Sequence, residues 1–141
     1  MTINKSLFSS SSEEWETPED LFNLLNKEFD FTLDPCATKE NTKCEKYFTK
    51  QQNGLNQNWD GERVFMNPPY GRKIGLWMKK AAESKAITVC LVPSRTDTLW
   101  WHDTVEKKAK EIRFIKGRIK FVGGLYAAPF PSVIVIFNNL K

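Results

Sequence analysis

The sequence has 141 residues, which is enough for one domain with one hydrophobic core and too few for two. Its 40% hydrophobic and 27% charged residues are ordinary for a globular protein, and no apolar run has the length of a membrane-spanning helix or a signal core. A net charge of +4 fits a polyanionic partner without requiring one. We therefore expect a soluble protein of the cytoplasm with no membrane contact.

The cysteines and the single histidine argue against a metal site. Cys36, Cys44 and Cys90 include no C-x-x-C pair, and His102 adds only one further candidate ligand. Free thiols in a reducing compartment are the simplest interpretation, and we expect no bound metal.

The first ordered element is predicted to follow a serine-rich tail. Residues Met1–Ser12 are expected to be mobile, in front of a single domain over residues 13–141. Thr17 is placed to cap a helix, with Pro18 in the first turn and acidic residues behind it. An apolar stripe with helical spacing follows, formed by Leu21, Phe22, Leu25 and Phe29.

A short strand over Phe29–Leu33 is expected to end at Asp34-Pro35-Cys36-Ala37. Ligands of α/β proteins bind at the carboxyl ends of strands, so Asp34 is a candidate ligand-binding carboxylate, although the same residue before Pro35 is also typical of a turn. The loop is not rich in glycine, which argues against a phosphate-binding dinucleotide site.

The stretch Thr38–Asn58 is polar and shows little periodicity apart from a brief strand expected within Lys46–Thr49. Asn53-Gly54-Leu55 and Trp59 stand out because a polar side chain and an apolar ring can flank an adenine. A tryptophan is nevertheless more often part of the core.

The strand predicted at Arg63–Met66 leads into Asn67-Pro68-Pro69-Tyr70-Gly71. The two prolines fix φ near −65°, provide no N–H group and keep the preceding residues out of the helical region. The backbone carbonyls can therefore point outward beside the Asn67 side-chain oxygen, and Tyr70 offers a flat face for stacking. These groups suit a planar ring or amide with an exocyclic amino group; the plainer alternative is a proline-rich turn.

The second half of the chain predicts a helix, a buried strand and another helix. Ile74, Trp77, Met78, Ala81 and Ala82 follow helical spacing, and Arg72 and Lys73 before them either contact a substrate phosphate or begin a solvated helix. The strand Ala86–Val92 ends at Pro93-Ser94-Arg95-Thr96-Asp97, and a helix is expected over Thr98–Lys110.

Basic and apolar residues alternate over Glu111–Phe121, around Gly117. The pattern would bring Arg113, Lys116, Arg118 and Lys120 near one another, either to contact a nucleic-acid backbone or to protect an edge strand. A loop bracketed by Gly123-Gly124 and Pro129-Phe130-Pro131 precedes a last buried strand, Ser132–Phe137.

Polar loops thus follow three predicted strands, at Asp34, Asn67 and Ser94. In a doubly wound sheet these loops lie at one edge, so we expect a single binding cleft there.

The ordered motifs along the chain resemble the phage-type DNA N6-adenine methyltransferase family, which is grouped with Dam-like enzymes. The resemblance implies a Rossmann-like α/β fold, with a mostly parallel sheet, an antiparallel last strand and no separate target-recognition domain. It rests on Trp15-x-Thr17-Pro18, Leu33-Asp34-Pro35-Cys36-Ala37, Gly54-Leu55, Trp59, Asn67-Pro68-Pro69-Tyr70-Gly71, Leu91–Asp97, Phe114-Ile115-Lys116-Gly117-Arg118 and Pro129-Phe130-Pro131-Ser132.

The same resemblance implies roles for individual residues, with S-adenosylmethionine as cofactor and DNA as partner. The catalytic group would be Asn67, Pro68, Pro69 and Tyr70, in which Asn67 and Pro68 orient the target amine and Tyr70 stacks on a flipped adenine. The cofactor would be bound by Trp15, Thr17, Pro18, Asp34, Pro35, Cys36, Ala37, Asn53, Leu55 and Asn67. DNA would be contacted by Arg72, Lys73, Arg95, Arg118 and Lys120.

Two departures from the family pattern limit these implications. An acidic residue is expected where Asn53 stands, so the affinity for the cofactor is open. The chain also has no room for the separate target-recognition domain of larger adenine methyltransferases. Its sequence specificity must therefore be low, come from short loops or depend on a homodimer. Two alternative functions also stay open: methylation of RNA or of a protein glutamine amide, and a catalytically inactive DNA-binding relative.

Overall fold

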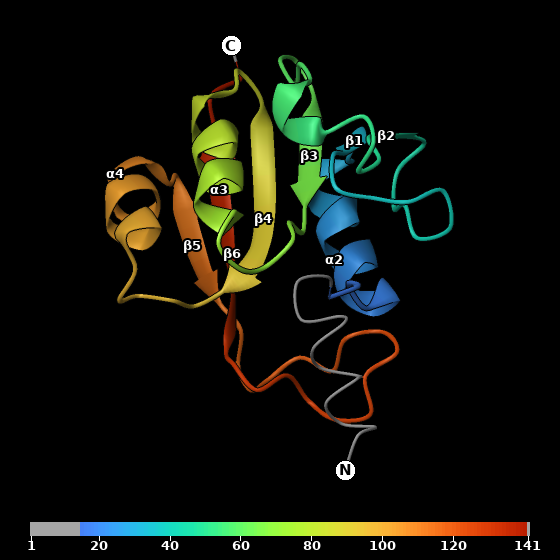
Figure 1. Cartoon of the computed structure of the whole chain (residues 1–141), viewed down its shortest axis with the longest axis vertical. Coiled ribbons are helices and arrows are strands. Elements are labelled where there is room, and N and C mark those ends of the chain that lie inside the picture. Colours follow the sequence, from blue (N-terminus) through green and yellow to red (C-terminus); the bar gives the residue numbers. More distant parts are fainter. Residues whose placement is uncertain (1–14, 141) are drawn as a thin grey trace.

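The fold is organised around a six-stranded sheet with the strand order β2-β1-β3-β4-β6-β5 (Figure 1). The computed structural model describes residues 15–140, so the tail expected over Met1–Ser12 lies outside it. The strands are β1 (Leu33–Asp34), β2 (Lys46–Tyr47), β3 (Arg63–Met66), β4 (Ile87–Pro93), β5 (Glu111–Phe114) and β6 (Ser132–Asn138).

The strands from β1 to β4 pair in parallel, and β6 runs antiparallel to both of its neighbours, β4 and β5. This arrangement confirms the predicted α/β fold with a mostly parallel sheet and an antiparallel last strand.

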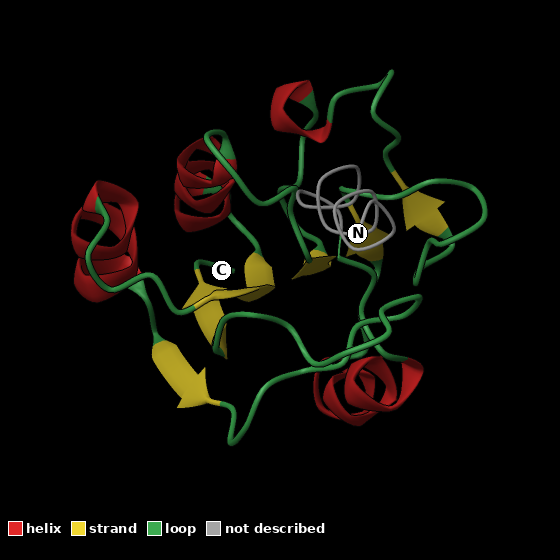
Figure 2. Cartoon of the chain, turned by 60° about the horizontal axis from the view of Figure 1, so that its bottom comes forward, coloured by secondary structure: helices red, strands yellow, loops and turns green. Residues whose placement is uncertain are grey.

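Helices cover both faces of the sheet (Figure 2). On one side lies α2 (Glu19–Phe29), whose Phe22 ring meets Phe65 of β3 at 5.2 Å between centroids. On the other side lie α3 (Ile74–Glu83) and the helical run formed by η2 (Trp101–Val105), a π-helical turn, and α4 (Glu106–Lys108). The short 3₁₀ helix η1 (Gly54–Asn56) lies beside α3. No helix within residues 15–140 is long and apolar enough to cross a membrane.

Two local predictions near α2 were wrong. The helix continues to Phe29 and ends when Asp30 adopts a left-handed conformation (φ 53°), so the strand begins only at Leu33 and not at Phe29. At the other end Pro18 occupies the cap position with no side-chain cap hydrogen bond. Thr17 does not cap the helix, because its hydroxyl group is bonded elsewhere, as described below.

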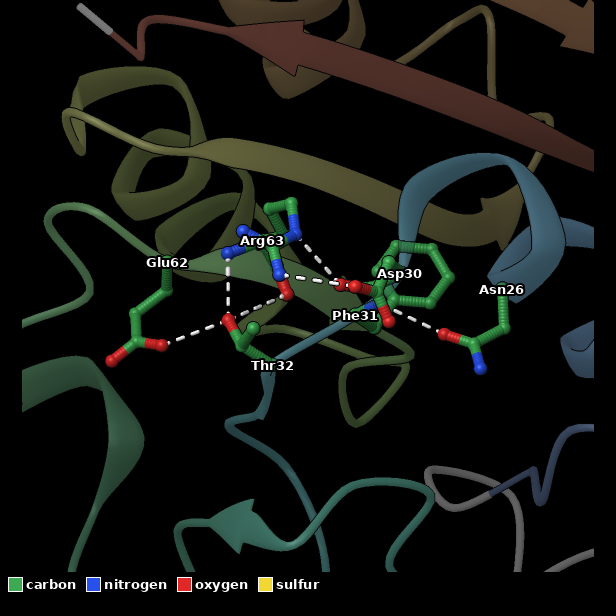
Figure 3. A network of polar contacts seen from close by, with 6 residues as sticks. All are labelled: Asn26, Asp30, Phe31, Thr32, Glu62 and Arg63. Atoms are coloured by element: carbon green, nitrogen blue, oxygen red, sulfur yellow. Dashed lines mark hydrogen bonds and ion pairs between the residues drawn. The ribbon is translucent and has the colours of Figure 1, made fainter.

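A polar network ties the turn after α2 to the start of β3 (Figure 3). The Thr32 hydroxyl donates to Glu62 Oε1 at 2.8 Å and accepts from the Arg63 backbone N–H at 2.8 Å, while Arg63 Nε donates to the Asp30 carbonyl at 2.7 Å. Leu33 then pairs with Val64 across β1 and β3. The network therefore holds the starts of these two neighbouring strands in register.

The basic stretch predicted over Glu111–Phe121 is a strand only as far as Phe114. Gly117 has φ 77°, and from Ile115 the chain becomes a long loop to Pro131, here called the 115–131 loop. Arg113 does not join the other basic residues, because its guanidinium donates to both oxygens of Glu28 on α2 at 2.7 Å. For Arg113 the edge-strand interpretation is therefore the correct one.

The 115–131 loop folds back across the carboxyl end of the sheet towards the start of α2 (Figure 1). The backbone N–H of Ala128 donates to Ile119 at 2.7 Å, and that of Val122 donates to Glu16 at 3.0 Å. Four apolar side chains of the loop are buried: Ile119, Phe121, Ala128 and Phe130. The loop and residues 15–17 thus pack together over the strand ends.

Candidate active site

The Asn67 side chain is held at the carboxyl end of β3 by the segment before α2. Its Nδ2 donates to the backbone carbonyl of Trp15 and, at 2.9 Å, to the Thr17 hydroxyl oxygen. Because a carbonyl can only accept, these bonds fix which way round the amide lies. The other amide atom, Oδ1, is buried and has no hydrogen-bond partner in the described part of the chain. A buried acceptor left unpaired is costly, so this oxygen is a prepared position for a donor.

Tyr70 is buried in an aromatic cluster, defined as Trp15, Tyr70, Phe121 and Phe130. Its ring centroid lies 5.6 Å from that of Phe130 and 6.5 Å from those of Trp15 and Phe121, and its hydroxyl donates to the Leu91 carbonyl at 3.1 Å. Burial raises the pKa of the phenol well above its usual range. The side chain is only 5% exposed, so a base can stack on it only after Trp15 or the 115–131 loop moves.

Asp34 is a buried carboxylate at the end of β1. Its Oδ1 accepts from the Cys36 N–H at 3.3 Å and its Oδ2 from the Lys43 N–H at 3.1 Å. Burial raises the pKa of this carboxyl to about 6, and the two N–H donors only partly oppose that shift. The bond to Cys36 fits the turn-forming interpretation, while the burial prepares the carboxylate to gain from a cationic ligand.

Gly54 brings η1 directly against the loop after β1. A Cβ at this position would lie 2.3 Å from the Pro35 carbonyl oxygen and 3.1 Å from the Trp77 ring. The Gly54 carbonyl accepts from Trp59 Nε1 at 2.9 Å, and Trp59 is fully buried, as its core interpretation predicted. The two predicted cofactor segments, Asp34–Ala37 and Asn53–Leu55, are therefore in contact.

Replacing Gly54 with alanine is expected to lower the free energy of unfolding by about 1–3 kcal/mol, because the added methyl group meets a backbone carbonyl that cannot move away cheaply. Urea denaturation followed by circular dichroism measures this loss. Gly124→Ala is the comparison and should cost less, since its Cβ would approach the Phe121 and Tyr126 carbonyl oxygens only to 3.3 and 3.4 Å. Equal stability of the two variants would contradict the close approach described for Gly54.

Asn53 already uses its side-chain oxygen to hold the turn of η1. Its Oδ1 accepts from the Leu55 N–H at 3.2 Å in the first turn of η1, and its backbone has φ 54°. The oxygen has a second lone pair, so it could accept from an adenine amino group only in addition to this bond. The remaining predicted cofactor residues include Pro18, at the start of α2, and Cys36, whose thiol pKa is raised by burial. Ala37 is buried and donates its N–H to Phe48 at 3.1 Å.

The five predicted DNA-contacting residues are all exposed, and they fall into two groups. Arg72 and Lys73 follow Gly71 and directly precede α3. Arg95 lies with its guanidinium carbon 5.9 Å from the Phe130 ring, which places it beside the 115–131 loop. That loop carries the remaining two, Arg118 and Lys120.

Sequence reasoning missed the role of the 115–131 loop in the site. Phe121 and Phe130 were seen only as parts of a basic stretch and of a proline-flanked loop, yet both pack on Tyr70. The available signal was the alternation of exposed Arg118 and Lys120 with buried Ile119 and Phe121, which predicts one apolar side without saying what it covers. Within residues 15–140, no three side chains among His, Cys, Asp and Glu gather as metal ligands would.

Comparison with known proteins gives one consistent family. The family model described as DNA N-6-adenine-methyltransferase (Dam) matches residues 5–141. A DNA N-6-adenine-methyltransferase of Haemophilus phage HP1 (strain HP1c1) is 32% identical over 118 residues, which cover 80% of this chain and 68% of the relative. A second, of Escherichia phage T1, is 29% identical over 153 residues, covering 90% and 63%.

A putative methyltransferase, YfdM of Escherichia coli (strain K12), is 36% identical over 66 residues, covering 41% of this chain and 71% of the relative. The chain therefore spans about two thirds of the length of the two phage relatives. The family match includes the ends of β1, β3 and β4 and the 115–131 loop, all of which contribute to the site. On these findings the chain belongs to the DNA N-6-adenine-methyltransferase (Dam) family.

Proposed function

We propose that this protein transfers a methyl group from S-adenosylmethionine to the N6 amino group of adenine in DNA. The observation that carries the proposal is the buried Asn67 Oδ1, which lacks a hydrogen-bond donor in the described structure and stands directly before Pro68-Pro69-Tyr70. An exocyclic amino group has two N–H donors to offer such an acceptor. The names of the phage relatives support adenine in DNA as the substrate.

The chain's own contribution to the reaction is positioning. Asn67 Oδ1 and the Pro68 carbonyl would each accept one N–H of the amino group, so that the nitrogen lone pair is drawn out of conjugation with the ring and directed to one side. Thr17 and the Trp15 carbonyl keep the Asn67 amide in the required orientation. Pre-set acceptors of this kind lower the barrier without reorganising during the reaction.

The residues beside Asn67 fit the proposed cofactor. S-adenosylmethionine supplies, when bound, an electrophilic methyl group on a sulfonium ion. Its methionine end carries an ammonium group, and Asp34 is a buried carboxylate whose ionised form would be stabilised by such a cation. Trp15, Pro35, Cys36, Ala37 and Leu55 would provide the apolar contacts, with Thr17, Pro18, Asn53 and Asn67 around them.

The first test is tritiated methyl transfer from S-adenosylmethionine to unmethylated DNA, followed by nucleoside analysis. We expect N6-methyladenine as the labelled product. Label in RNA or in a protein glutamine amide, but not in DNA, would instead support the alternative substrates. DNA binding without any methyl transfer or cofactor binding would support a catalytically inactive relative.

Cofactor binding is expected to weaken as the pH falls through about 6. The raised pKa of Asp34 means that its carboxyl takes up a proton near that pH, and the neutral form offers no charge to the cofactor's ammonium group. Below this pH the affinity should fall about tenfold per pH unit, as for a single linked proton.

Without cofactor, Asp34 favours the folded state at acid pH, and this contribution is lost as the pH rises from about 4 to about 6.

Titration calorimetry between pH 5 and pH 8 measures the effect. Asp34→Asn serves as the control, because it has no carboxyl to protonate and its weaker affinity should not change over this range. A pH-independent affinity in the unaltered protein would remove Asp34 from the cofactor site.

The remaining proposals concern setting and assembly. The phage relatives support the cytoplasm of a bacterial host as the place of action. A homodimer is proposed as one way to extend the DNA contact surface, and light scattering with and without DNA tests it.

A further inference from the structure

The tip of the 115–131 loop is apolar and exposed. Val122, Leu125 and Tyr126 are 51%, 58% and 63% exposed, so three of the eight large hydrophobic side chains that are exposed within residues 15–140 lie in five consecutive positions. Single exposed hydrophobic residues are normal, but a concentration of them on one loop indicates a contact surface. Here the apolar tip is defined as these three residues.

The same loop is firmly held at its base. Ile119, Phe121, Ala128 and Phe130 are buried, and the Phe121 and Phe130 rings pack on Tyr70. Gly123, with φ 84°, turns the chain within the tip, between Val122 and Leu125. The packing of Phe121 and Phe130 on Tyr70 therefore places the apolar tip next to the residues that would receive the target base.

The charge of the loop favours a polyanion as the occupant. Residues 115–131 include Lys116, Arg118 and Lys120 and no acidic residue, and Arg95 lies against the loop at Phe130. Basic side chains on the loop that carries an apolar tip suit a duplex, whose phosphates lie outside and whose stacked bases lie inside. An apolar protein surface would gain nothing from these positive charges.

We infer that the apolar tip inserts into the base stack of duplex DNA beside the target adenine and occupies the space that the base leaves when it turns out towards Asn67. This inference rests on the proposed function. Removing a base from a duplex requires unstacking, and apolar side chains inserted between base steps stabilise the unstacked form. Tyr126 and Leu125 are the side chains that fill the gap, while Arg118 and Lys120 contact the neighbouring phosphates.

The test compares two duplexes that contain a methylation site mapped with the unaltered protein. In one the target adenine is paired, and in the other it is mismatched, so that it leaves the stack more easily. The double variant Leu125→Ala, Tyr126→Ala should slow methylation of the paired duplex about tenfold or more, because each lost stacking contact with a base lowers the stability of the unstacked form by about that factor. Methylation of the mismatched duplex should change less than about threefold.

The matched control is Leu24→Ala, which removes an exposed leucine (67%) from α2 and should leave both rates unchanged. The inference is overturned if the double variant slows both duplexes equally, if it slows neither, or if it converts a dimer to a monomer, which would make the tip a contact between two copies. If the unaltered protein methylates no DNA at all, the proposed function itself has failed.

Discussion

Replacing Asn67 with alanine is expected to lower the rate of methyl transfer about 10²–10³-fold, the cost of removing one pre-set hydrogen-bond partner from a reacting group. The loss should appear in kcat, because Oδ1 acts on the amino group and is one of two acceptors proposed for it. The affinity for S-adenosylmethionine should change far less, since Asp34 and the loops after β1 remain intact. Single-turnover kinetics and calorimetry measure the two quantities separately.

Asn23→Ala is the control, because Asn23 is an exposed residue on α2 away from the strand ends. One complication comes from the other half of the Asn67 amide, which bonds to Trp15 and Thr17. If cofactor affinity collapsed as much as turnover, Asn67 would act mainly by holding the segment before α2. Its proposed role on the target amine would then be wrong.

Replacing Tyr70 with alanine is expected to lower the free energy of unfolding by about 3–5 kcal/mol, as for other large buried aromatic residues. The ring packs against Trp15, Phe121 and Phe130, so its removal leaves a cavity at the junction of three chain segments. Because a small domain is stable by only about 5–15 kcal/mol, this loss affects the whole fold. Urea denaturation at constant protein concentration measures it.

Tyr70→Phe separates stability from base stacking. It keeps the ring and loses only the hydrogen bond to the Leu91 carbonyl, which costs about 0.5–1.5 kcal/mol. Methylation should stay close to normal, because stacking needs the ring and not the hydroxyl. A Tyr70→Ala variant as stable as the unaltered protein would contradict the burial of this side chain.

The parts of the fold that follow from local pattern were predictable. The strands β3 and β4 and the helix α3 lie close to where apolar runs and helical spacing predicted them. The position of the polar loops at one edge of the sheet was also predictable, because the carboxyl ends of parallel strands lie at the same edge. The boundary between α2 and β1 failed because Asp30 ends the helix in a left-handed conformation, which is rare for a residue other than glycine.

The environment of the site was not predictable, because it depends on contacts between distant segments. Thr17 has the sequence context of a helix cap, yet its hydroxyl serves Asn67, fifty residues later. Tyr70 has the sequence context of an exposed stacking ring, yet Phe121 and Phe130 cover it. The first contact is recognisable only once the segment before α2 has been placed beside the end of β3, and the second only once the 115–131 loop has been placed over the strand ends.

The position of β6 between β4 and the edge strand β5 has a consequence for the order of folding. This strand comes last in the sheet along the chain, yet it pairs with β4 at seven positions and with β5 at four. Until it inserts, β5 has no partner strand and β4 is paired only with β3, and the 115–131 loop that carries Phe130 is anchored at one end only. Contacts so distant in sequence form late. A nascent chain on the ribosome that lacked residues 132–138 would therefore carry Asn67-Pro68-Pro69-Tyr70 without an assembled site around it.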